Sequence, residues 1–141
     1  MKKTIISNSP EETFSFAQDL AKDIRIPSVI ALHGDLGAGK TIFTKGVALG
    51  LGIEEDITSP TFSLMESYEG DKPLYHFDLY RIENPVEFDQ LRFEEYWEGD
   101  GVSVIEWPEK AGDMLPENRI NVYIEYIDEH RRKITVEYTG N

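Results

Sequence analysis

The chain has 141 residues, of which 40% are hydrophobic, and this is the size of one average domain with its own core. Its 14 Lys and Arg residues against 27 Asp and Glu residues give a formal net charge of −13, which disfavours unaided binding to nucleic acid. Cysteine is absent, which excludes disulfides and thiolate chemistry, and no apolar stretch approaches the roughly 18 residues of a membrane span. We therefore expect a single domain over residues 1–141, located in the cytoplasm.

The first predicted elements are a helix and a buried strand. Ser9 and Glu12 form a capping box, Pro10 stands at the first helical position, and apolar residues then recur at three- and four-residue spacing. This pattern predicts a helix over residues 10–24. The apolar run at residues 29–32 is typical of a strand that is buried on both faces.

The remaining predicted elements are strands and helices in mixed order. Along the chain they are a helix from about 39 to 50, strands over 62–68 and 74–80, a helix over 85–96, a strand over 102–105, and strands over 120–126 and 134–138. Glycines at 50 and 52 suit a left-handed stop for the first of these helices. Two lysines begin the chain as in a signal peptide, but polar residues and a proline at 7–10 follow before any long apolar region forms. We therefore expect no signal peptide there.

A glycine-rich segment carries the strongest chemical signal. Residues 34–41, Gly-Asp-Leu-Gly-Ala-Gly-Lys-Thr, match the phosphate-binding P-loop G-x-x-x-x-G-K-[ST] in full, directly after an apolar strand and directly before a helix. The glycines let successive backbone N–H groups converge on phosphate oxygens, and the helix N-terminus adds the positive end of its dipole. The predicted nucleotide contacts here are Asp35, Leu36, Gly37, Ala38, Gly39, Lys40, Thr41 and Ile42.

Hydrolysis of a bound nucleotide also needs Mg²⁺ and a carboxylate at a strand end. Lys40 is expected to bridge the terminal phosphates, and the Thr41 hydroxyl is expected to ligate Mg²⁺. Glu106 follows an apolar run and is assigned to hold Mg²⁺ through water or to orient the attacking water. Asp78 is a second candidate for the magnesium shell, and a surface or hydrogen-bonded carboxylate is the alternative for both acids. His33, His76 and His130 lie too far apart in sequence to suggest a metal site.

Two further segments carry open alternatives. Residues 58–61, Thr-Ser-Pro-Thr, follow the P-loop helix and fit either a loop that senses the nucleotide state or an ordinary turn. Trp107 fits either packing over the site or a place in the core. Residues 83–113 hold ten acids against Arg92 and Lys110, which is typical of a solvated face and also suits contact with a basic partner.

Together these segments resemble the TsaE (YjeE) family, the small bacterial ATPases of tRNA threonylcarbamoyladenosine synthesis. The matching segments are residues 34–41, 59–62, 76–81 and 105–109, with Leu115 and Pro116 beyond them. Ile42 and residues 91–96 depart from the usual family pattern, and neither departure touches a residue assigned to chemistry.

The resemblance implies an α/β P-loop NTPase fold, with a mixed, mostly parallel sheet flanked by helices. The C-terminal antiparallel strand pair would complete that sheet. It also implies ATP and Mg²⁺ as ligands and the TsaB and TsaD proteins as partners, with tRNA met only through their complex. In that family the ATPase does not transfer the threonylcarbamoyl group, and hydrolysis is thought to reset the complex that does.

The resemblance also implies roles for single residues. By position, Lys40 binds phosphate, while Thr41, Asp78 and Glu106 serve the metal and hydrolysis. Thr61 belongs to the loop that senses the nucleotide, and Trp107 matches the tryptophan that lies near the nucleotide in the family.

A small P-loop kinase and a nucleotide-gated binding module are the alternative functions. A kinase of this type usually has a mobile lid with several arginines, whereas here only Arg131 and Arg132 form a basic pair, in a predicted terminal hairpin. A GTPase is disfavoured because residues 44–47, Thr-Lys-Gly-Val, lack the aspartate of the guanine-reading motif. No residue is an unambiguous arginine finger, so we expect slow hydrolysis by the chain alone and stimulation by partners.

Overall fold

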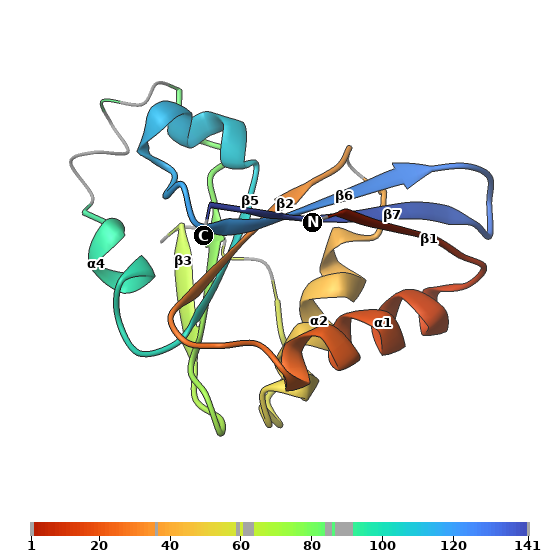
Figure 1. Cartoon of the computed structure of the whole chain (residues 1–141), viewed down its shortest axis with the longest axis horizontal. Coiled ribbons are helices and arrows are strands. Elements are labelled where there is room, and N and C mark those ends of the chain that lie inside the picture. Colours follow the sequence, from red (N-terminus) through yellow and green to blue (C-terminus); the bar gives the residue numbers. More distant parts are fainter. Residues whose placement is uncertain are drawn as a thin grey trace.

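The structure is a computed structural model that describes residues 2–35, 37–58, 60, 64–83, 86 and 92–140. The described residues form a seven-stranded sheet in the order β1-β7-β6-β2-β5-β4-β3 (Figure 1). The strands are β1 Lys2–Ser7, β2 Ser28–His33, β3 Met65–Tyr68, β4 Leu74–Asp78, β5 Val102–Glu106, β6 Arg119–Tyr126 and β7 Arg132–Thr139.

The sheet is mixed, as predicted. Its four central strands β6, β2, β5 and β4 run parallel to one another. The flanking strands β7 and β3 and the edge strand β1 pair antiparallel with their neighbours, which confirms the C-terminal antiparallel pair β6–β7. Because the central strands share one direction, the carboxyl ends of β2, β5 and β4 meet at one edge of the sheet.

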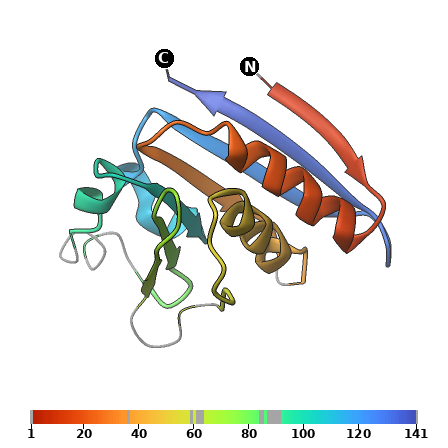
Figure 2. The ribbon, with the colours of Figure 1, turned by 90° about the horizontal axis from the view of Figure 1, so that it is seen from below.

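Helices cover both faces of this sheet. Helix α1 Pro10–Lys22 and helix α2 Lys40–Gly50 lie side by side on one face (Figure 2). The short helix α4 Glu94–Trp97 and the 3₁₀ segment η1 Pro108–Met114 contribute to the apolar cluster on the opposite face. Both faces of β2 and β5 are therefore buried, which explains why these strands are continuous apolar runs in the sequence.

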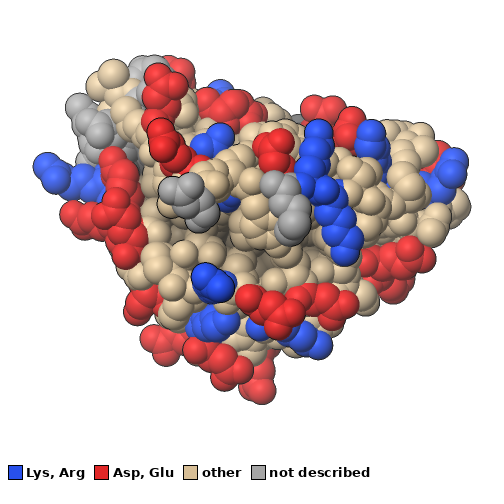
Figure 3. All heavy atoms as spheres, in the orientation of Figure 1, with Lys and Arg blue, Asp and Glu red and all other residues tan. Residues whose placement is uncertain are grey.

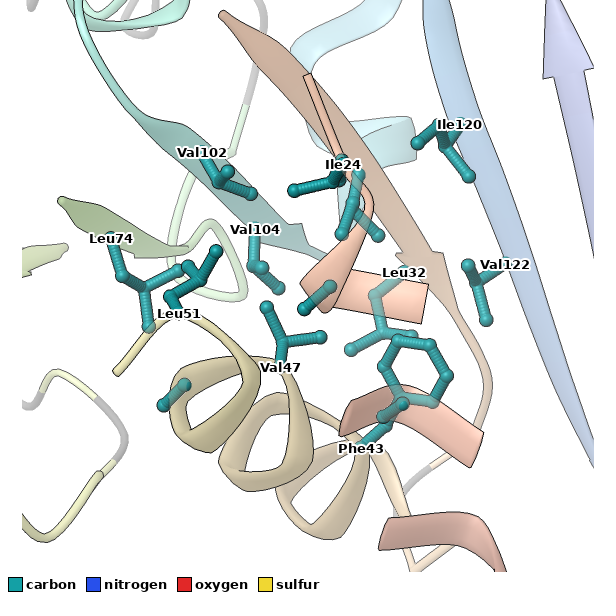
Figure 4. Packing of buried hydrophobic residues seen from close by; sticks show 14 of the residues in the cluster. Ile24, Leu32, Phe43, Val47, Leu51, Leu74, Val102, Val104, Ile120 and Val122 are labelled. Atoms are coloured by element: carbon teal, nitrogen blue, oxygen red, sulfur yellow. The ribbon is translucent and has the colours of Figure 1, made fainter. Parts of the chain in front are cut away.

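Alternate strand residues form two separate cores. On the face covered by α1 and α2, Leu32 of β2 and Val104 of β5 pack with Phe43 and Val47 of α2 (Figure 4). Each such side chain that leaves water contributes about 1.5–3 kcal/mol to folding. This core fixes α2, and with it the P-loop, against the carboxyl end of β2.

Helix α1 approaches α2 closely because α2 carries glycine at the contact. A Cβ atom built on Gly46 would lie 2.8 Å from the Cβ of Ala17, and one built on Gly50 would lie 2.8 Å from the Cβ of Ala21. Real Cβ atoms do not approach this closely, so alanine at either position would push the helices apart. The i, i+4 spacing of the two glycines forms one seam along α2.

The termini of the helices follow the sequence signals with one small difference. The Ser9 side chain accepts a hydrogen bond from the Glu12 N–H at 3.1 Å, which confirms the predicted cap of α1. The helix ends at Lys22, two residues before the predicted end, because Asp23 leaves the helical conformation. Helix α2 ends as predicted at Gly50, with Gly52 in the left-handed region at φ 79°.

Other elements differ from the sequence prediction. Residues 2–7 form β1 and residues 108–114 form η1, and the sequence pattern predicted no element at either place. Strand β4 ends at Asp78 and not at 80, because the Asp78 carboxylate accepts the Tyr80 N–H at 3.0 Å and turns the chain. The predicted helix over 85–96 falls largely outside the described residues. In its described part Arg92 is left-handed at φ 56°, which interrupts a helix, and only Glu94–Trp97 are helical, as α4.

Candidate functional site

The P-loop joins the carboxyl end of β2 to the start of α2. Gly39 caps α2 in the left-handed region, at φ 107°, which is a conformation that a side chain disfavours. Gly39 has no side chain that could cap the first N–H groups of this 11-residue helix. Uncapped N–H groups and the positive end of the helix dipole suit an anion at this position. Asp35 and Gly37 are exposed in the same loop, and Leu36 lies outside the described residues.

Lys40 brings a buried positive charge to the start of α2. The residue is only 6% exposed, and its Nζ has no hydrogen-bond partner among the residues that the structure describes. The ammonium lies 4.0 Å from the centre of the Trp107 ring. A desolvated cation–π contact contributes about 2 kcal/mol or somewhat more, which offsets only part of the several kcal/mol lost when an ammonium leaves water. A phosphate oxygen would supply the missing partner.

Trp107 reaches this position through an unusual backbone. Its φ of 58° and ψ of 50° are left-handed, which costs about 1–3 kcal/mol at a bulky residue. The strained turn directs the indole toward Lys40, and the Tyr80 ring packs against it with 5.1 Å between ring centres. The half-buried Trp107 therefore joins the P-loop region, and its nucleotide contact stays a prediction.

The two predicted carboxylates lie next to each other at the same edge of the sheet. Asp78 and Glu106 are register partners on the parallel strands β4 and β5, and Glu106 is in turn the partner of Leu32 on β2. Register partners point to the same face of a sheet. Both carboxylates therefore face the side that carries α2 and the P-loop.

The two acids have different surroundings. Glu106 is only 5% exposed, and its Oε2 lies 2.5 Å from Nε2 of His76. Asp78 is half-buried and is held by the backbone N–H of Tyr80. Burial also distinguishes Glu106 from most of the other described acids in residues 83–113. The exposed acids of that segment are Glu83, Glu95, Glu98, Asp100, Glu109 and Asp113.

The residues at this edge fit a magnesium ion bound together with a nucleotide. The described residues hold no cluster of three or more His, Asp or Glu side chains that would form an all-protein metal cage. Mg²⁺ usually takes one or two carboxylates and completes its shell with water and phosphate oxygens. Asp78, Glu106 and the exposed hydroxyl of Thr41 match that donor set.

Arg132 at the start of β7 contacts the P-loop from the far end of the chain. Its Nε donates to the Ala38 carbonyl at 3.0 Å, and its Nη1 donates to the Asp128 carbonyl at 2.7 Å. In the sequence, Arg132 stands out only as part of a basic pair. A contact between residues 94 positions apart has no local signal, and only the register of the sheet reveals it.

The turn before Arg132 is tightly organised. The Asp128 carboxylate accepts hydrogen bonds from the Arg131 side chain and from the backbone N–H groups of His130 and Arg131. The Arg131 side-chain hydrogen bond, followed by the two backbone N–H groups, lowers the pKa of Asp128 below its usual value. A small hollow of about 90 Å³ separates this turn from the P-loop and the start of α1. Its lining includes Ser9, Gly37, Ala38, Gly39, Ile42 and Arg132.

The predicted sensing loop is only partly described. Thr58 is exposed, and its backbone N–H and carbonyl oxygen both contact the hydroxyl of Tyr68, at 3.5 and 3.4 Å. Thr61 lies outside the described residues, so its sensing role stays a prediction. The structure thus brings Lys40, Thr41, Asp78, Glu106 and Trp107 to one region, and it adds two residues that the sequence analysis did not assign, His76 and Arg132.

The surface reflects the acidic composition. On the face shown in Figure 3, Asp and Glu side chains follow the lower and left edges, with Lys and Arg side chains standing among them. No helix among the described residues is long and apolar enough to cross a membrane.

Comparison with known proteins places the chain in a family. The sequence model of "Threonylcarbamoyl adenosine biosynthesis protein TsaE" matches residues 7–134. The TsaE protein of Bacillus subtilis is 42% identical over 134 residues, which cover 94% of this chain and 84% of that protein. The TsaE protein of Treponema pallidum is 41% identical over 131 residues, which cover 93% of this chain and 97% of that protein.

A solved structure has the same fold. The crystal structure of YdiB from Bacillus subtilis superposes with a TM-score of 0.84 at 37% sequence identity, covering all of this chain and 88% of that one. The family match extends over nearly the whole chain and includes the P-loop, both carboxylates and Trp107. The chain therefore belongs to the TsaE family.

Proposed function

We propose that the chain is a Mg²⁺-dependent ATPase that serves the machinery of tRNA threonylcarbamoyladenosine synthesis. The observation that carries the proposal is the buried Lys40 ammonium, which has no hydrogen-bond partner among the described residues and lies at the uncapped start of α2. Such a group is costly unless an anion pairs with it. The names of the relatives, which are threonylcarbamoyladenosine biosynthesis proteins, support the biological context.

The proposed reaction is hydrolysis of the terminal phosphoanhydride. The P-loop N–H groups and Lys40 hold the β- and γ-phosphates, and a water molecule attacks the γ-phosphorus in line with the leaving oxygen. The bond between that phosphorus and the bridging oxygen breaks, which yields ADP and inorganic phosphate and releases the proton of the water. Glu106 orients the attacking water or holds the metal through water.

Thr41, Asp78 and Glu106 are the residues that would hold Mg²⁺. The ion, when bound, neutralises charge on the phosphate oxygens as the bond to the leaving group breaks. Glu106 and Asp78 support this role because they are register partners at the edge of the sheet where the P-loop begins. Trp107 and the hollow beside Ile42 and Arg132 are further candidates for contacts with the nucleotide.

Hydrolysis by the chain alone is expected to be slow. Arg132 is the arginine that contacts the P-loop, but its Nε and Nη1 are engaged by carbonyl oxygens. An arginine supplied by a partner raises the rate of P-loop enzymes by about 10³–10⁵. We propose the TsaB and TsaD proteins as the partners, with hydrolysis resetting their complex and not transferring the threonylcarbamoyl group. The net charge of −13 supports contact with tRNA through that complex only.

The test is ATP hydrolysis by the purified chain with Mg²⁺, alone and with the TsaB and TsaD proteins. Lys40→Ala serves as the blank. We expect a slow basal rate and a clear stimulation by the two partners, both lost in Lys40→Ala. Fast hydrolysis with no response to the partners would favour an independent NTPase or a small P-loop kinase. Equal background rates from both chains would refute the ATPase assignment.

A further inference from the structure

His76 is a polar side chain in the core that the proposed reaction does not use. It lies in β4 two residues before Asp78 and has no exposed surface. Its register partner on β5 is Val104, so the imidazole points to the same face of the sheet as Glu106, one pleat further along. Its Nε2 forms a hydrogen bond of 2.5 Å with Oε2 of Glu106.

The hydrogen-bond pattern indicates which ring nitrogen carries the proton. Nδ1 of His76 is buried and has no partner among the described residues. A buried N–H without an acceptor is rarer and more costly than a bare acceptor nitrogen. The arrangement therefore favours the tautomer in which Nε2–H donates to the Glu106 carboxylate and Nδ1 is the bare nitrogen.

This hydrogen bond limits where the Glu106 carboxylate can lie. A glutamate side chain has three rotatable bonds, and a carboxylate free to turn would be attracted to the buried ammonium of Lys40, which lies against the ring of the next residue, Trp107. Such an ion pair would neutralise the charge that is proposed to bind phosphate. In the structure Lys40 has no hydrogen-bond partner among the described residues, while Glu106 is held by His76.

We propose that His76 is a positioning residue, which fixes one oxygen of Glu106 and leaves the other oxygen for water or metal beside the phosphates. The inference rests on the ATPase function proposed above and names the group that orients its key carboxylate. Residues that hold a ligand from behind typically change affinity or activity by about 10–100-fold when they are replaced. Because His76 is proposed to act through Glu106, its loss should affect turnover and not the first binding of ATP.

Two amides at position 76 separate this role from simple packing. The amide nitrogen of glutamine reaches the place of Nε2, whereas that of asparagine reaches only the place of Nδ1. We expect His76→Asn and His76→Leu to lower kcat for ATP hydrolysis by about 10–100-fold, with the ATP KM and the directly measured nucleotide affinity changed by less than about threefold. His76→Gln should recover most of the turnover. Equal turnover of the Gln and Asn variants, compared at equal folded fractions, would overturn the proposal.

A double-substitution cycle tests whether His76 acts through Glu106. In the Glu106→Gln background, which removes the charge that His76 orients, His76→Leu should cause little further loss of turnover. If the two losses multiply, His76 acts elsewhere and the proposal is wrong.

The ¹⁵N spectrum of the histidine side chains gives a readout that needs no turnover. The unmodified chain should show one imidazole fixed as the Nε2–H tautomer, and its Nε2 signal should shift in Glu106→Gln. An imidazole that exchanges between tautomers, or one that does not respond to Glu106→Gln, would refute the hydrogen bond. If the unmodified chain fails to hydrolyse ATP while this spectrum is as expected, the failure lies with the proposed function and not with the His76–Glu106 contact.

Discussion

The two ends of the parallel strands differ in how their charged groups are satisfied. At the carboxyl ends, the Lys40 ammonium is buried against the Trp107 ring with no hydrogen-bond partner among the described residues. At the amino ends of β2 and β6 lies a much larger hollow of about 570 Å³, beside Arg25 and Arg119. There the Arg119 guanidinium donates to the Asn121 side chain at 3.1 Å and to the Pro116 carbonyl at 2.8 Å.

The size of a hollow is therefore a poor guide to the candidate functional site. The space beside the P-loop measures only about 90 Å³, yet Gly37, Ala38 and Gly39 in its lining lead directly into Lys40, whose buried ammonium has no hydrogen-bond partner among the described residues. Buried polar groups without a partner and strained backbone both cost free energy in the folded state. They cluster at sites where a bound ligand offsets that cost. The large hollow at the amino ends adjoins an arginine that is already paired with protein atoms.

The largest effect should come from Lys40→Met, because it changes function and stability in opposite directions. ATP hydrolysis should fall by about 10²–10³-fold, since the charge that meets the phosphates is lost. Without nucleotide, the free energy of unfolding in urea should stay the same or rise, by up to about 2 kcal/mol, because a buried unpaired ammonium is replaced by an apolar chain of similar length.

Lys45→Met is the matched control for that experiment, because Lys45 is an exposed lysine on the same helix. It should change hydrolysis and stability little, within about 0.5 kcal/mol for unfolding. A large loss of stability in Lys40→Met would mean that Lys40 has a structural partner, and the contrast between the two ends of the sheet would then fail.

The second effect concerns the buried carboxylate. Glu106→Gln keeps the size of the side chain and a hydrogen-bond acceptor for His76, but it removes the charge. Turnover should fall by about a hundredfold, while nucleotide affinity changes much less. The release of phosphate followed over time measures turnover, and equilibrium titration with nucleotide measures affinity. Glu109→Gln, at an exposed acid three residues further on, should have no such effect, and unchanged turnover in Glu106→Gln would remove Glu106 from the mechanism.

The third effect tests the scaffold beneath the P-loop. Gly46→Ala should lower the free energy of unfolding by about 1–3 kcal/mol, because the added methyl group meets the Cβ of Ala17 on α1. Chemical denaturation measures this loss, with Lys45→Ala as the exposed neighbour that should be nearly neutral. If Gly46→Ala is as stable as the unmodified chain, the close contact between α1 and α2 does not fix the position of the P-loop helix.

The part of the molecule around the P-loop could be predicted from sequence because its signals are local. The cap at Ser9, the apolar strand over 29–32 and the glycine stop at residue 52 each determine the conformation of a few neighbouring residues. The P-loop motif then fixes the chemistry expected at the start of α2. These elements are all confirmed within one or two residues, and the early end of α1 lies within that range.

The rest depends on contacts between distant parts of the chain. Residues 2–7 become β1 only because they pair with β7 at the other end of the sequence, where Ile5 is the register partner of Ile134. The contacts from His76 to Glu106 and from Arg132 to Ala38 likewise follow from sheet register, which a single sequence does not reveal. The sequence therefore predicted the position of the P-loop better than the contacts that hold its residues in place.

The smallest effect is expected when one arginine at each end of the parallel strands is replaced, and this experiment compares the two ends directly. Arg132→Met removes the hydrogen bond to the Ala38 carbonyl, so the P-loop should be less well ordered and the ATP KM should rise by about three- to tenfold with kcat little changed. Arg119→Met removes similar bonds at the amino ends, and it should leave both kinetic constants within about twofold while lowering stability slightly. Replacing each arginine by methionine thus distinguishes an arginine that orders the P-loop from one that only stabilises the fold. If Arg119→Met raised the KM as much as Arg132→Met, the large hollow at the amino ends would have to be linked to ATP binding, and unpaired buried charge would no longer identify the site.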